Sequence, residues 1–169
     1  MTQCWIRVSP YIIPAILESG RFKTQIETGS SLNAVIDADL RISKDGGNVI
    51  YGYLCNTANG AATHGHDAIL NEYGQAAIRL NESVKARTTF CIADSLYQAV
   101  EPMQYSESAL PENLDEILPY VEAQYVGGVT VADIAEVVFQ VYADEKAPQR
   151  IIDLLQACGI ACSINSVQE

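Results

Sequence analysis

Two polar side chains stand two positions apart in an otherwise apolar segment, YVEAQYV at residues 120–126. If this segment is a strand, Glu122 and Gln124 point to one face, and the apolar side chains between them point to the other. A carboxylate on the inner face of a strand needs either a partner, such as an arginine at the sheet edge, or a chemical role. In the second case it can orient a ligand hydroxyl and stabilise positive charge on a sugar ring, with Gln124 as a second polar contact.

A second group of hydrogen-bonding side chains lies in RFKTQIETGSS, residues 21–31, between two apolar segments. The stretch carries more such groups than a solvated turn needs. Either these groups surround a ligand, or the stretch is a structural loop that caps its own backbone through Thr28 and Ser30. Glu27 can hold such a loop by pairing with Arg21 or Arg87, and both interpretations stay open.

Other chemical motifs are weak or absent. The sequence contains neither a G-x-G-x-x-G nor a G-x-x-x-x-G-K-[ST] phosphate loop, and no G-x-S-x-G elbow. His64, His66 and Asp67 could hold a metal, but their spacing and Gly/Ala-rich surroundings favour a polar loop, so no metal site is predicted. The five cysteines are scattered without C-x-x-C spacing and are predicted to be buried free thiols.

Composition restricts the class of protein. A chain of 169 residues with 49% hydrophobic and 18% charged residues predicts one globular domain. The net charge of −11 argues against general binding to nucleic-acid phosphates, which requires a basic face. No apolar run approaches the roughly 18 residues of a membrane helix, and residues 1–10 do not resemble a signal peptide. We therefore expect a cytoplasmic protein that does not enter a membrane; the sequence predicts no oligomeric state.

The elements that must position these side chains follow from apolar runs and turn residues. Residues 57–67 read as a loop and residues 101–116 as a long acidic excursion that could recognise a target. The remaining segments are mostly strands, and most of them are not separated by helices, which indicates an α+β fold with a mainly antiparallel or mixed sheet. The predicted strands are 4–8, 48–56, 75–80, 88–92, 117–128, 136–141 and 160–167, and the predicted helices are 10–20 and 148–159.

The order of these blocks resembles a known family. A first strand with WIRV, a helix ending in ESG, and a late strand whose Glu122 runs into GGVTVADI together resemble the ADP-ribosyltransferase-like superfamily. The further blocks RFKTQIETGSS, IYGYL and EYGQAAIRLNESVKARTTFCIADSL resemble a branch found in bacterial proteins of unknown function and beside phage head-morphogenesis proteins. The resemblance covers roughly residues 5–165.

The resemblance implies a single domain over residues 1–169, a split β-sandwich of mainly antiparallel strands with a few peripheral helices and a cleft for NAD. Glu122 would bond a ribose hydroxyl and support the oxocarbenium-like transition state as nicotinamide leaves, assisted by Gln124. Six further residues are implied at the NAD site. They are Arg7, Arg21, Gln25, Thr28, Tyr51 and Thr88. Tyr51 could equally belong to the core, and Arg7 could be an ordinary strand arginine that faces solvent. Thr88-Thr89 would stand in for the Ser-Thr-Ser motif of the family, which this sequence lacks.

The implied function is NAD-dependent mono-ADP-ribosyl transfer to a macromolecule, a protein target being expected, as in a toxin, effector or phage protein. Arginine-directed members carry Glu-x-Glu, whereas this chain has Glu122-x-Gln124 and no acidic residue at position 120, so an arginine acceptor is not expected. Two alternatives remain open at this point: a catalytically inactive protein-binding module of the same fold, and an NAD glycohydrolase that passes ADP-ribose to water.

Overall fold

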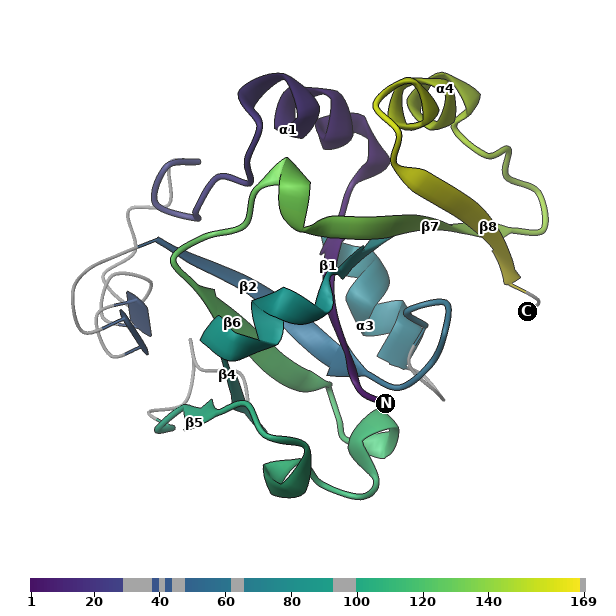
Figure 1. Cartoon of the computed structure of the whole chain (residues 1–169). Coiled ribbons are helices and arrows are strands. Elements are labelled where there is room, and N and C mark those ends of the chain that lie inside the picture. The colour runs from purple at the N-terminus through teal and green to yellow at the C-terminus, as the bar shows by residue number, and fades with distance from the viewer. Residues whose placement is uncertain (29–37, 40–41, 44–47, 62–65, 93–99, 168–169) are drawn as a thin grey trace.

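The computed structural model describes residues 1–28, 38–39, 42–43, 48–61, 66–92 and 100–167, with the side chains of 66–69 excluded (Figure 1). Among these residues, eight strands and three helices whose bounds are described form an α+β domain. The strands are β1 (Gln3–Val8), β2 (Val49–Cys55), β3 (Ala76–Leu80), β4 (Thr88–Cys91), β5 (Met103–Gln104), β6 (Val121–Val126), β7 (Ile134–Tyr142) and β8 (Ala161–Val167). The helices are α1 (Ile13–Ser19), α3 (His66–Tyr73) and α4 (Gln149–Ala157), with short 3-10 turns at 10–12, 82–87, 107–109, 114–116 and 131–133.

All eight strands belong to one sheet, in the order β5-β4-β6-β2-β1-β3-β7-β8. Every neighbouring pair is antiparallel except β7 and β8, which are parallel and joined through α4. The prediction of an α+β fold with a mainly antiparallel sheet is therefore confirmed. In the part of the chain that the structure describes, the strands form one continuous sheet rather than the two stacked sheets of the expected sandwich.

The centre of the sheet is nevertheless divided. Strands β1 and β2 pair only where Gln3–Trp5 meets Tyr53–Cys55. Beyond Trp5, β1 keeps its pairing with β3 as far as Val8, and β2 keeps its pairing with β6 as far as Val49. The two four-stranded halves therefore part along the second half of β1, as the diverging ribbons show (Figure 1).

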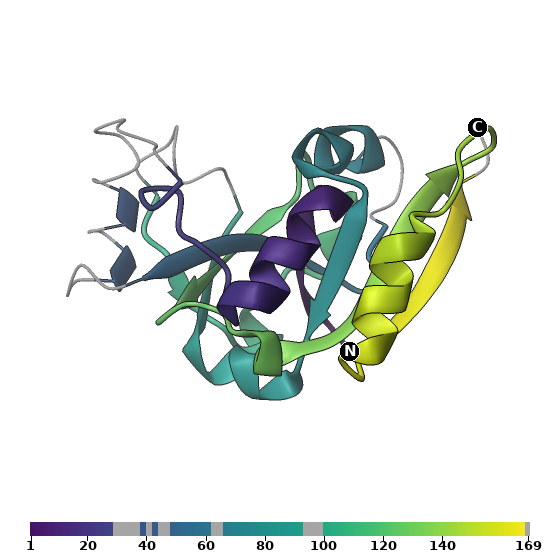
Figure 2. The same cartoon turned by 90° about the horizontal axis from the view of Figure 1, so that it is seen from above.

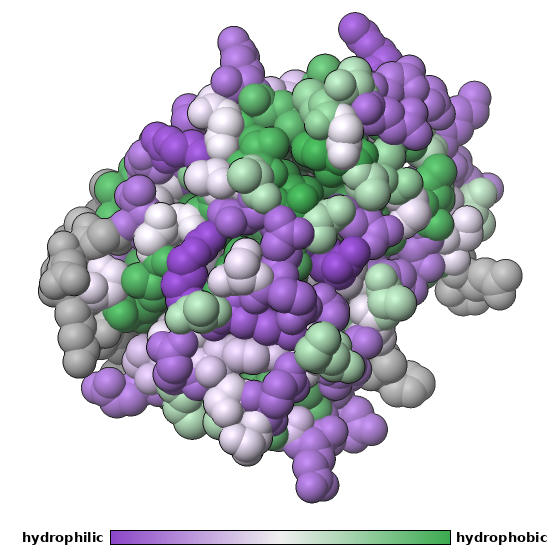
Figure 3. Space-filling view, viewed as in Figure 1, coloured by the Kyte–Doolittle hydropathy of each residue, from purple (hydrophilic) through white to green (hydrophobic). Residues whose placement is uncertain are grey.

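The two faces of the sheet differ in character because side chains alternate along each strand. One face is apolar and carries the main core, which α1 and α4 cover through Ile13, Ile16 and Leu155 (Figure 2). The other face carries a smaller cluster around Trp5, packed against α3 through Leu70, and the polar residues of the candidate site. Hydrophobic residues also reach the surface over the region of α1 and α4 (Figure 3).

The helices covering the apolar face begin and end at residues suited to those positions. Helix α1 has Pro14 in its first turn and ends at Gly20, whose φ of 77° is left-handed and whose N–H donates to the carbonyl of Ile16. Helix α4 follows Pro148 and stops before Gly159. No helix among the described residues is long and apolar enough to cross a membrane.

Two predicted segments differ from the structure in part. The loop expected at 57–67 is confirmed for residues 57–61, but α3 begins at His66 and continues to Tyr73, and residues 62–65 lie outside the described residues. Within the acidic excursion predicted at residues 101–116, the structure adds β5 and two 3-10 turns, and Leu114 is buried in the main core. The cysteine prediction holds for Cys4, Cys55 and Cys91, which are free and buried; Cys158 is free but exposed and Cys162 half-buried.

Candidate functional site

The Glu122 carboxylate lies in a buried hydrogen-bonded network on β6, between β2 and β4. The Gln124 Nε2 donates to Glu122 Oε1 at 2.6 Å, and the Thr89 hydroxyl donates to Gln124 Oε1 at 2.8 Å. Since an ionised carboxylate only accepts hydrogen bonds, the amide must present its NH₂ group to Glu122. The Thr89 hydroxyl favours the same orientation because it donates to the oxygen of the Gln124 amide. The network therefore fixes both the amide and the carboxylate.

The expected alternation along β6 is confirmed. Glu122 and Gln124 share the polar face, with exposed fractions of 5% and 0%, while Ala123 and Tyr125 belong to the main core on the opposite face. The Gln124 amide also contacts Cys91 Sγ at 3.4 Å. A buried carboxylate held by a short hydrogen bond has a defined position before any ligand arrives.

Two tyrosines of β2 stand opposite this pair, Tyr51 beside Gln124 and Tyr53 beside Glu122. The Tyr51 hydroxyl donates to Asp39 at 2.5 Å, and burial raises the pKa of the Asp39 carboxyl above its ordinary value, although the Tyr51 bond acts in the opposite direction. The Tyr53 hydroxyl donates to the carbonyl of Gly60 at 2.6 Å. Both rings are therefore oriented by acceptors outside the sheet.

Arg7 is buried on the same polar face, but its guanidinium is directed to acceptors within the chain. Its Nε donates to the Tyr53 hydroxyl at 3.1 Å and its Nη1 to Asn71 Oδ1 at 2.9 Å. Further bonds reach the carbonyls of Gly74 and Gly60. These contacts tie α3 and the 57–61 turn to β1, so the geometry assigns Arg7 a structural role rather than an exposed one.

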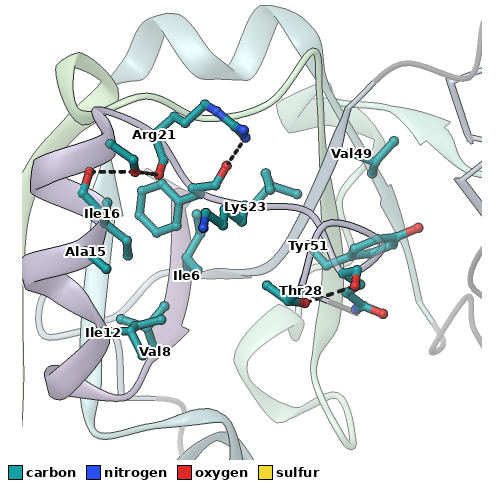
Figure 4. A pocket seen from close by; sticks show the side chains of 14 residues that line it. Ile6, Val8, Ile12, Ala15, Ile16, Arg21, Lys23, Thr28, Val49 and Tyr51 are labelled. Carbon is teal, nitrogen blue, oxygen red and sulfur yellow. Dashed lines mark hydrogen bonds between the residues drawn. The ribbon is translucent and has the colours of Figure 1, made fainter. Parts of the chain in front are cut away.

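A pocket of about 340 Å³ opens where β1 and β2 part, beneath α1 (Figure 4). Its floor is apolar, and its polar groups come mainly from the segment 21–28 and from Tyr51. This volume is at the small end of the roughly 300–1,000 Å³ that small-molecule sites occupy. The lining residues are Ile6, Val8, Ile12, Ala15, Ile16, Ser19, Arg21, Phe22, Lys23, Gln25, Thr28, Val49, Ile50 and Tyr51.

The segment 21–28 is held in place by an internal clip. Arg21 makes two bonds to the Glu27 carboxylate, at 2.9 and 2.7 Å, as one of the two expected pairings predicted. The Thr24 N–H donates to Glu27 Oε2, and the Glu27 N–H donates back to Thr24 Oγ1. The Arg21 bond, with help from the Thr24 N–H, lowers the pKa of Glu27 to about 2.

Both interpretations of the opening polar stretch therefore have support. Thr28 Oγ1 donates to the carbonyl of Gln25 at 2.9 Å, as expected of a loop that caps its own backbone. At the same time Arg21, Gln25 and Thr28 all line the pocket. Ser30 lies outside the described residues, as does His64.

One lining cation was missed by the sequence reasoning. Lys23 is exposed and extends over the pocket from the same segment (Figure 4), and none of the described carboxylates forms an ion pair with it. Its position in RFKTQIETGSS, two residues after Arg21, was the available signal. The pocket thus combines an apolar floor with an ammonium group that is not engaged by another described side chain.

Thr88 does not reach the polar face. Its side chain is fully buried on the apolar side, where its hydroxyl donates to the carbonyl of Val84 at 2.8 Å. Thr89 stands opposite Gln124 and takes the place that the prediction gave to Thr88. The TTFCI pattern shows that Thr88 and Thr89 point to opposite faces of the sheet. It does not show which of the two lies on the face of Glu122, because that depends on the register of β4 against β6.

The structure thus brings most of the predicted residues into two groups, Glu122 with Gln124 on the polar face and Arg21, Gln25 and Thr28 at the pocket, while Thr88 joins neither group. Tyr51 belongs to both, since it lines the pocket and is the register partner of Gln124, itself bonded to Glu122. Among the described residues, no three His, Cys, Asp or Glu side chains gather in a way that could hold a metal ion. Comparison of the chain with protein-family models and with curated proteins finds no match.

Proposed function

We propose that this protein is an NAD-dependent mono-ADP-ribosyltransferase. The observation that carries the proposal is the buried Glu122 carboxylate, held at 2.6 Å by Gln124, whose register partner Tyr51 lines the pocket at the parting of β1 and β2. Stabilisation of a cationic sugar requires a preorganised carboxylate. Glu122 lies on the face of the sheet opposite the apolar floor of the pocket, so in this proposal the dinucleotide reaches the carboxylate past Tyr51, through the parting of β1 and β2. The resemblance of the sequence blocks to ADP-ribosyltransferases supports the same conclusion.

In this proposal the pocket binds part of the dinucleotide. The apolar floor formed by Ile6, Val8 and Ile50 suits a flat aromatic ring, and the cations Lys23 and Arg21 suit phosphate oxygens. Gln25 and Thr28 offer further hydrogen-bonding groups at the pocket wall.

The reaction breaks the bond between the nicotinamide nitrogen and the anomeric carbon of the ribose. The electron pair leaves with nicotinamide, which departs neutral, and positive charge grows on the anomeric carbon and the ring oxygen. The fixed Glu122 carboxylate stabilises this charge more than it stabilises the neutral ground-state sugar, which lowers the barrier. A nucleophile of the target protein then bonds to the anomeric carbon and loses its proton.

One set of observations favours a second candidate, an inactive binding module of the same fold. Only 5% of Glu122 is exposed, and Arg7 is bonded to acceptors within the chain. In that case the network would stabilise the sheet, and NAD would not bind.

The test measures NAD binding by calorimetry and nicotinamide release over hours, for the wild type and for Glu122→Gln. The matched control is Glu136→Gln, since Glu136 is a half-buried glutamate of β7 bonded to Arg79 and Ser163. We expect Glu122→Gln to lower nicotinamide release by about 10²-fold or more, the usual loss when an electrostatic stabiliser is removed, and Glu136→Gln to have little effect.

The product separates the remaining alternatives. A labelled protein band from labelled NAD identifies a transferase, whereas release of free ADP-ribose without a band identifies a glycohydrolase. No binding at millimolar NAD contradicts the enzyme and supports the inactive module.

A further inference from the structure

Strand β8 forms one end of the sheet and its outer edge is open. In the described structure it pairs only with β7, through seven consecutive parallel register pairs without a bulge. It lies at the outer margin of the molecule, and α4 covers its face rather than its edge (Figure 2). Its outward N–H and C=O groups therefore form a template for another strand.

Strand β8 lacks the features by which sheet edges are normally protected. Its sequence ACSINSV contains no charged residue and no proline, and it is seven residues long. The opposite edge of the sheet is protected by its shortness, because β5 has two residues. The contrast between the two edges indicates that β8 is an interaction surface.

We propose that β8 pairs antiparallel with β8 of a second copy of this chain, around a two-fold axis at Ile164. Ile164 is the middle residue of the strand, so this register pairs all seven residues without an overhang. It places Ile164 opposite its own copy, Ser163 opposite Asn165, and Ala161 opposite Val167, so apolar residues meet apolar ones and hydrogen-bonding residues meet each other. An isologous contact of this kind needs no second type of surface.

One further observation permits a second copy as the occupant, and another favours it. The net charge of −11 opposes self-association, but none of that charge lies in β8, so the contact itself brings no like charges together. In addition, large apolar side chains remain exposed in this unit: 50% of Ile164 and 38% of Leu154 on α4 are accessible. Ile164 lies on the face that α4 covers, because its register partner Phe139 belongs to the main core, and pairing around Ile164 would bury its exposed part.

Sedimentation velocity across a concentration series tests this inference. We expect the wild type to reach twice its monomer mass of 18.4 kDa. Ile164→Lys places two ammonium groups opposite each other at the axis and should raise the dimer dissociation constant by about tenfold or more. The matched control is Met103→Lys on β5, a similarly exposed apolar residue at the other edge, and it should leave the constant unchanged.

A cross-linking experiment fixes the register without depending on the lysine variants. In a Cys158→Ser, Cys162→Ser background, Ile164→Cys should form a covalent dimer on mild oxidation, and Met103→Cys should not. A monomer at all concentrations overturns the inference and leaves the edge to a strand of another protein. A dimer that survives Ile164→Lys, or that does not cross-link at position 164, also overturns it. None of these readouts depends on NAD, because four strands separate β8 from β6 in the sheet.

Discussion

Thr89 supports Glu122 only indirectly, through Gln124, so its contribution can be tested separately from that of Glu122. Its hydroxyl donates to Gln124 Oε1 and thereby holds the amide that donates to Glu122. Thr89→Val removes that donor and leaves a buried oxygen without its bond, which costs about 1–3 kcal/mol in stability. If Glu122 acts on NAD, we expect nicotinamide release to fall about tenfold or more in kcat with little change in KM, since the loosened carboxylate is misplaced in the transition state.

Thr89→Ser is the matched control, because it keeps the hydroxyl and should retain most of the activity. A loss in kcat for Thr89→Ser without a loss for Thr89→Val, which keeps the methyl group, would show that packing of the methyl group matters rather than the hydrogen bond. The folded fraction of each variant is checked by its thermal melting curve.

The Glu27 carboxylate predicts a distinct pH dependence at the pocket. Its pKa of about 2 in the folded chain lies below the ordinary value of 4.5, so the clip to Arg21 is fully formed above pH 4.5 and is lost as the pH falls through about 2. The backbone N–H of Thr24, which donates to Glu27, reports this transition in an NMR titration. A midpoint near 4.5 would mean that the clip does not form in solution, and Glu27→Gln should abolish the transition.

The limits of the sequence reasoning are clearest for single residues. Alternation alone placed Glu122 and Gln124 on one face, because both lie in one strand and need no tertiary information. It could not choose Thr89 over Thr88, which requires the register of β4. Nor could it show that Arg7 bonds Asn71, a residue 64 positions away whose helix was not predicted.

At the level of the elements, seven of the eight described strands were predicted, because each is a short run of strand-forming residues bounded by turn residues, whereas β5 has only two residues and was not predicted. Helix α3 was not predicted either, because its eight residues HDAILNEY form a short helix and follow a Gly/Ala-rich stretch. Its position is set by tertiary contacts, including the bond from Arg7 to Asn71. The parting of β1 and β2, which makes the pocket, likewise has no signature in either strand taken alone.

The junction where β1 and β2 still meet gives a prediction about the sheet. A Cβ at Gly52 would lie 2.0 Å from the carbonyl oxygen of Trp5 and 2.7 Å from the ring of Tyr125, whose hydroxyl donates to that same oxygen. Gly52→Ala must therefore push the two strands apart, and we expect it to lower the free energy of unfolding by about 3 kcal/mol, the upper end of usual overpacking costs.

Gly20→Ala provides the comparison for this measurement by chemical denaturation. Gly20 has a left-handed φ of 77° but open space around its missing Cβ, so its substitution should cost only about 1 kcal/mol in backbone strain. Equal costs for the two substitutions would contradict a close approach of β1 to β2 at Gly52.

At the scale of the whole molecule, the net charge of −11 makes the salt dependence of self-association informative. Two copies that approach through β8 repel each other over a distance set by the Debye length, about 30 Å at 0.01 M salt and about 10 Å at 0.1 M. The contact itself consists of main-chain hydrogen bonds and uncharged side chains, which salt does not weaken in this way. Added salt should therefore screen the repulsion and lower the dimer dissociation constant, as sedimentation at a series of ionic strengths would measure. A dissociation constant that rises with salt would instead require ion pairs across the interface, which ACSINSV cannot supply, and would move the contact to another surface of the chain.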